Sequence, residues 1–136
     1  MAVSINVLRN VLSSDEPDYE GLRRLGPALL PQLQQLVRDR NAYLAANAAS
    51  LAGMIGGAQA AAVLQQAGRS PSADVRIAAA GALRHLRGAN VSGLLASLSK
   101  DRDPDVRMSA LKASRRAGTA VATRAGPPSP GRPRQA

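Results

Sequence analysis

Few side chains in this sequence of 136 residues could do chemistry. There is no cysteine, which excludes a thiolate nucleophile, a cysteine zinc site and a disulfide framework. The single histidine, His85, excludes a multi-histidine metal site within the chain, and no Asp, Ser or Cys is spaced to work with it as a base. We therefore predict that the chain is not an enzyme, that it holds no cofactor, and that His85 is a surface or half-buried residue.

Three aspartates at alternate positions, Asp101, Asp103 and Asp105, faintly resemble a calcium-binding loop. Counting from the first of them, Val106 stands at the sixth position, where such a loop needs glycine, and Lys112 stands at the twelfth, where it needs a bidentate glutamate. We therefore predict no metal site here.

The chain carries 18 Lys and Arg against 9 Asp and Glu, which gives a formal net charge of +9. This balance favours an acidic partner: nucleic acid, an anionic membrane surface or an acidic protein. Much of the charge follows the last acid, Asp105, and residues 1–114 hold 13 basic and 9 acidic side chains. With two Tyr, no Phe and no Trp, the chain also lacks stacking platforms for single-stranded nucleic acid.

The uncharged stretch 41–68 is long enough to span a bilayer, which takes about 20 apolar residues. Its apolar residues are mostly Ala, however, and Asn, Gln and the Gly56-Gly57 pair interrupt it. The N-terminus has no basic region followed by a long apolar run, so it does not resemble a signal peptide. We predict a cytoplasmic protein without a membrane segment.

Internal repeats indicate the architecture. Gly26, Gly57 and Gly88 are 31 residues apart, Gly118 follows 30 residues later, and loop signals lie between them at 38–42, 68–73 and 100–104. Each unit is thus two stretches of about 10 to 14 residues, which is helix length. The same spacing relates the following sets: Asp74-Val75-Arg76 and Asp105-Val106-Arg107; Leu33, Leu64 and Leu95; Ala48, Ala79 and Ala110. An alternative alignment stays open, in which the first unit is shifted by one residue so that Tyr43 corresponds to Val75.

The second helix of each unit has an apolar stripe, formed in the second unit by Val75, Ala79, Ala82, Leu83 and Leu86. A helix pair of this kind buries one face only, so neighbouring pairs must stack to complete a core.

The segment LLASLSKDRDPDVRMSALKAS resembles a HEAT repeat of the short type first noted in phycobilisome-lyase-like proteins. The resemblance rests on an acidic loop, a proline, Val-Arg and spaced Ala, here Asp101, Pro104, Val106, Arg107, Ala110 and Ala113. The second unit keeps Val75, Arg76 and Ala79 but has Ser70 where the loop acid belongs. The first unit keeps Asp39 but has Ala45 where the arginine belongs.

The resemblance implies an all-α fold, a short right-handed α-solenoid of about three HEAT-like helix pairs with an N-terminal helical cap. We expect the cap at 1–26, with helices over 3–12 and 19–25, and the repeats at 27–57, 58–88 and 89–118. The Pro- and Gly-rich basic segment 119–136 is expected to be a disordered tail.

In this family the loop Asp and the Arg of successive repeats form a buried ladder of hydrogen bonds. Here the resemblance implies a complete pair of Asp101 with Arg107, with Arg76 as a neighbour. It also implies that the second helices line the concave surface, which would place five arginines on the binding face or its edge: Arg76, Arg84, Arg87, Arg107 and Arg115. These could form a shallow basic groove, or Arg76 and Arg107 could be structural and the others solvated charges.

We therefore expect a non-enzymatic interaction module or adaptor that binds another protein through its concave helical face. The alternative is weak, sequence-independent binding of nucleic acid by the arginines and the basic tail. Some HEAT-like folds are enzymes, such as DNA glycosylases, iron hydroxylases and bilin lyases. The glycosylases use several aromatics where this chain offers Tyr19 and Tyr43, the paired His-Glu motifs of the hydroxylases are absent, and nothing in the sequence points to bilin.

Overall fold

The computed structural model describes residues 3–117, and every regular element in that range is a helix. The α-helices, joined by the short 3₁₀ segments Gly26–Leu29 and Leu83–His85, are α1 (Ile5–Leu12), α2 (Tyr19–Arg23), α3 (Leu30–Leu36), α4 (Ala42–Ile55), α5 (Ala58–Ala67), α6 (Ala73–Ala82), α7 (Ala89–Leu98) and α8 (Pro104–Ala117). The expected tail, 119–136, lies outside the described residues, and the division into cap, repeats and tail at the stated residues stays a prediction.

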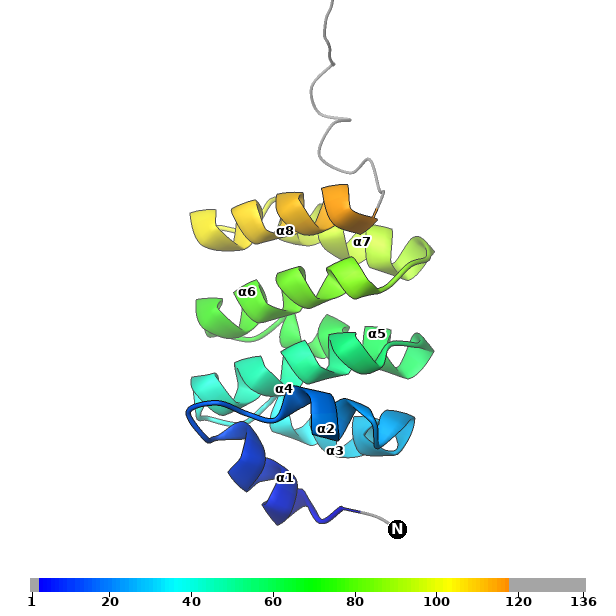
Figure 1. The fold of residues 1–136 in the computed structure, drawn as a ribbon. Coiled ribbons are helices and arrows are strands. Elements are labelled where there is room, and N and C mark those ends of the chain that lie inside the picture. The colour runs from blue at the N-terminus through cyan, green and yellow to red at the C-terminus, as the bar shows by residue number, and fades with distance from the viewer. Residues whose placement is uncertain (1–2, 118–136) are drawn as a thin grey trace, which may run out of the picture.

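The helices stack as antiparallel pairs. Figure 1 shows α4, α6 and α8 one above the other, with α8 at the top and α1 at the bottom of the stack. The helices α3, α5 and α7 each pack against the second helix of their own pair, and α2 packs against α4. The predicted short α-solenoid is therefore confirmed.

Glycines make the turns between the pairs. Gly26, Gly57 and Gly88, the residues whose spacing first indicated the repeat, all have positive φ, at 76°, 93° and 121°. Residues other than glycine rarely adopt such φ values. Glycine at these positions therefore lets the chain turn from one helix pair into the next. Gly56, with a φ of 81°, ends α4 in the same way.

The core alternates large and small side chains. On the first helices Leu33, Leu64 and Leu95 are fully buried, as the repeat predicts. On the second helices the buried positions are mostly alanines, among them Ala48, Ala49, Ala52, Ala79, Ala80 and Ala110. Small side chains allow α4, α6 and α8 to approach one another more closely than α3, α5 and α7 do. We call the face formed by α4, α6 and α8, the more closely packed layer of the stack, the inner face.

The register of the first unit follows from burial. Leu44, Val75 and Val106 lie 31 residues apart and are all buried, whereas Tyr43 is 47% exposed. Leu44, and not Tyr43, is therefore the counterpart of Val75. The slipped alignment is wrong, because it would expose a residue that belongs to the core stripe.

Two second helices come very close together at Gly53 of α4. A Cβ atom added to Gly53 would lie 2.6 Å from the Cβ and 2.8 Å from the carbonyl oxygen of Ala82 on α6. Backbone atoms cannot move aside as a flexible side chain can, so this position tolerates no side chain without separating the two helices.

This contact gives a first prediction, with a matched control. Gly53→Ala should lower the free energy of unfolding by about 1–2 kcal/mol, because the steric cost outweighs the helix propensity that alanine gains. Gly93→Ala in α7 should instead raise it by about 0.5–1 kcal/mol, because an added Cβ there meets nothing within 4 Å. Urea unfolding of both variants checks this, and equal stabilisation by the two changes would contradict the packing described.

Candidate partner-binding face

Each second helix is preceded by the same turn. Asp39 accepts a hydrogen bond from the Asn41 N–H at 2.9 Å, and Asp101 accepts one from the Asp103 N–H at 2.9 Å. In the middle unit the Ser70 hydroxyl does the same for the Ser72 N–H, at 3.1 Å. Ser70 thus keeps the turn of an aspartate loop without its charge.

A buried ion pair joins the second and third units. Arg76 is only 6% exposed, and its Nε and Nη2 donate to the two carboxylate oxygens of Asp101, at 2.9 and 3.2 Å. Its Nη1 donates to the carbonyl of Ser70, at 2.8 Å. One arginine therefore ties the loop of its own unit to the loop of the next.

The electrostatics of Asp101 reflect this arrangement. Burial raises the pKa of its carboxyl group, but the Asp103 N–H and the Arg76 guanidinium outweigh that effect and hold the pKa below its ordinary value of 3.8. The carboxylate is therefore charged in the folded chain at neutral pH.

The expected pairing of Asp101 with Arg107 is wrong in one respect. Arg107 Nη1 donates to the backbone carbonyl of Asp101, at 2.7 Å, and not to its carboxylate. This bond repeats the one from Arg76 to Ser70, since both arginines lie six residues after the loop residue. The carboxylate faces the preceding unit, where it meets Arg76.

The other rungs of the ladder differ in an informative way. Arg76 lies 25 residues before Asp101, and the same spacing leads from Ala45 to Ser70. Both ends of that rung are uncharged, so neither leaves a buried charge without a partner. In the first loop, Asp39 instead forms an ion pair with Arg9 of α1. The Asn41 N–H and the Arg9 guanidinium together lower the pKa of Asp39.

A hollow of about 260 Å³ opens between α6 and α8. Its lining is made of small and cationic residues: Gly81, Arg84, Ser109, Lys112 and Ala113. Arg84 and Lys112 are exposed, and Arg84 Nη1 donates to the Gly81 carbonyl at 2.9 Å, which holds its stem against α6. The hollow can accept an acidic group between two cations.

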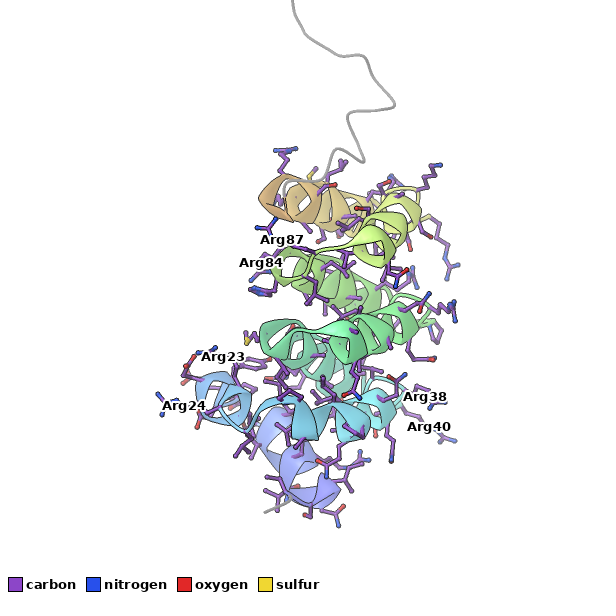
Figure 2. The ribbon with its side chains drawn as sticks, turned by 90° about the vertical axis from the view of Figure 1, so that its right-hand side faces the viewer. Arg23, Arg24, Arg38, Arg40, Arg84 and Arg87 are labelled. Atoms are coloured by element: carbon purple, nitrogen blue, oxygen red, sulfur yellow. The ribbon has the colours of Figure 1, made fainter. Side chains whose placement is uncertain are left out.

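The arginines do not form one continuous stripe. Figure 2 shows Arg84 and Arg87 on one side of the stack, and Arg38 and Arg40 on the opposite side. Arg87 lines a separate hollow of about 490 Å³ at the turns, together with His85.

Near the N-terminal end, two arginines form ion pairs with Glu20. The Nη2 atom of Arg23 lies 2.5 Å from the Oε2 atom of Glu20, and the Nε atom of Arg24 lies 4.0 Å from it. At the other end of the chain, Arg115 is exposed on α8. Of the five predicted site residues, only Arg84 lines the hollow between α6 and α8, and Arg76 is buried in its ion pair.

The aspartates of the third loop bind protein groups. Asp103 accepts hydrogen bonds from the Asp105 and Val106 N–H groups, at 2.8 and 3.2 Å, and so caps α8. Within residues 3–117 no group of three or more metal-binding side chains comes together. Nor does that range contain a helix long and apolar enough to cross a membrane.

Sequence reasoning missed Lys112, Ser109 and the Arg9–Asp39 pair. The 25-residue spacing could have identified the Arg76–Asp101 partners, because the joint loss of charge at Ala45 and Ser70 shows which positions belong to one rung. No pattern in the sequence points to the hollow, since it depends on the distance between two helices.

No family model matches the chain, and no curated protein matches it in sequence. Among solved structures, it is similar to the complex of CpcE and CpcF of phycocyanin lyase from Nostoc sp. PCC7120, with 23% sequence identity and a TM-score of 0.68. The match covers 84% of this chain and 78% of the other. It supports a HEAT-like helical-repeat fold.

The match also corrects an expectation. We predicted that the chain is not an enzyme, from the lack of a catalytic constellation in its sequence. The complex that shares its fold is a lyase, which contradicts that prediction. A lack of familiar motifs is poor ground for excluding activity in this fold, because solenoids can place reactive groups far apart in the sequence on one surface.

The ion pair between units gives a second prediction. Asp101→Asn should lower the free energy of unfolding by about 3–5 kcal/mol near neutral pH, because it leaves the buried Arg76 guanidinium without a countercharge. Asp74→Asn, an exposed change in the first turn of α6, should cost less than about 1 kcal/mol. Denaturant unfolding of the two variants measures the difference.

The pH dependence has a definite sign. A carboxyl group whose pKa is lowered by folding stabilises the folded chain above its ordinary value of 3.8, and this contribution is lost as the pH falls through the lowered value. The stability gap between the native chain and Asp101→Asn should therefore narrow below about pH 4. A gap that stays constant from neutral to acid pH would show that the carboxylate charge does not matter.

Proposed function

We propose that the chain is a short solenoid of HEAT-like repeats that binds another protein through its inner face, α4, α6 and α8, as an adaptor or as one subunit of an assembly. The observation that carries this proposal is the hollow between α6 and α8, which is lined by small residues and by the two cations Arg84 and Lys112. Within the described residues no acidic side chain lines it. An acidic side chain of a partner would find both room and charge there.

The comparison supports a protein partner. In the matched structure CpcE and CpcF form a complex, and together they belong to one lyase. Partner binding and enzyme activity are therefore compatible in this fold. The proposal for the present chain concerns the first of these, and it draws on the inner face that the close packing of the second helices creates.

The distribution of charge favours a protein over nucleic acid. A phosphate backbone needs several cations along one track, and affinity grows with the number of phosphates neutralised. Here Arg38 and Arg40 lie on the opposite side of the stack from Arg84 and Arg87. Arg23 and Arg24 lie on the same side as Arg84, but both are paired with Glu20. Two cations around a hollow suit a single acidic anchor, which is the way a few residues dominate a protein interface.

The test uses a photo-crosslinking amino acid at Ser109, inside the hollow, and a second one at the exposed Gln35 of α3 as the control site. In native lysate the chain labelled at Ser109 should capture a discrete protein, and the chain labelled at Gln35 should not. Arg84→Glu combined with Lys112→Glu should weaken that capture at least about tenfold, since it reverses the charge of both residues.

The matched control is Arg38→Glu combined with Arg69→Glu, which makes the same change in net charge at a different hollow. It should leave capture unchanged. Equal loss in both double variants would show that net charge and not the hollow is responsible. Binding of duplex DNA to the native chain that falls steeply with salt and is lost equally in both variants would favour the nucleic-acid alternative.

A further inference from the structure

Within the described residues, the two ends of the solenoid differ in whether the charged residue of the ladder has a partner of opposite charge. At the N-terminal end the loop acid Asp39 is bound by Arg9 of α1. At the C-terminal end Arg107 occupies the place of Arg76 in the next unit and makes the same bond to its own loop carbonyl. Its Nε and Nη2, the atoms that correspond to those binding Asp101, meet no carboxylate within residues 3–117. The ladder is closed at its beginning and open at its end.

Apolar side chains at the same end are also left uncovered. Ala80 of α6, which packs against α8, is fully buried, whereas its counterpart Leu111 on α8 is only half-buried. Ile77 packs against the core, whereas its counterpart Met108 is 50% exposed. Within residues 3–117 the end of the stack therefore has the apolar contact surface of an internal unit but is not covered by a further unit.

Residues 106–136 contain no acidic side chain that could take the place of Asp101. The position 25 residues after Arg107 is Arg132, and no acidic residue follows Asp105. A second copy joined end to end would bring Arg107 and Arg115 of both copies together, which like charges disfavour. A second copy joined head to tail would offer Asp39, which its own Arg9 already binds.

We propose that the α7–α8 end of the solenoid docks a helical hairpin of another protein, whose loop carboxylate binds Arg107 as Asp101 binds Arg76. The hairpin stacks as a fourth unit and covers Met108 and Leu111. This surface is distinct from the inner face, so the proposal goes beyond the function proposed above and stands without it.

A first experiment uses the full chain as it is. Arg76→Gln should raise the equilibrium constant for unfolding by about a hundredfold or more, because it leaves the buried Asp101 without a countercharge. Arg107→Gln, the same change at the open end, should raise it by less than about tenfold. Comparable effects of the two changes, measured by urea unfolding, would show that Arg107 is already fully bonded and would overturn the proposal.

A second experiment supplies the hairpin as a probe. A second copy of residues 88–118 is inserted after Gly118 of the full chain, so that the Asp101 of the added copy follows Arg107 by the ladder spacing. The added unit should gain helix and unfold together with the rest. Arg107→Gln in the original unit and Asp101→Asn in the added copy should be coupled. The two changes together should raise the equilibrium constant for unfolding at least about tenfold less than the product of the two single rises. Additive effects, or an added unit that gains no helix, would overturn the proposal.

Discussion

The close approach of α4 to α6 is the constraint on which the shape of this molecule depends. Gly53 lies against the backbone of Ala82, and alanines fill most of the other buried positions of the same layer. Because the first helices are held apart by leucines, the second helices form the narrow side of the stack. This difference in side-chain volume makes the inner face, α4, α6 and α8, the more closely packed layer of the stack.

Charge plays a second and more selective role. A buried carboxylate or guanidinium stabilises the fold only when its partner is present, and removing one member of a pair costs more than removing both. Each pair of positions in this ladder follows that rule. Arg76 and Asp101 are both charged, and Ala45 and Ser70 are both neutral. Asp39 forms its ion pair with Arg9 of α1. Within residues 3–117, Arg107 continues the ladder beyond the third unit, which distinguishes an end that stacks from one that is capped.

Much of the fold could be predicted from the sequence because its signals are local and repeated. Gly57 and Gly88 mark turns by their spacing, and Val75 and Ala79 mark a buried stripe by helical periodicity. The partner of Asp101 does not follow from these local signals, because within one unit Arg107 is the nearer arginine in sequence. It follows from the 25-residue spacing between units, at which Ala45 and Ser70 are both uncharged. Lys112 could not be connected with Arg84, since the hollow between them is a property of two helices from different units.

The central claim is that the inner face, at the hollow between α6 and α8, binds a protein. The sequence offers an internal control, because Lys100 and Lys112 are its two lysines and both are exposed. Lysine acetylation followed by mass spectrometry, on the free chain and on the chain purified with its native partner, tests the claim most directly. The account predicts that the partner protects Lys112 and leaves Lys100 as reactive as before. Protection of Lys100 with Lys112 unchanged would contradict it.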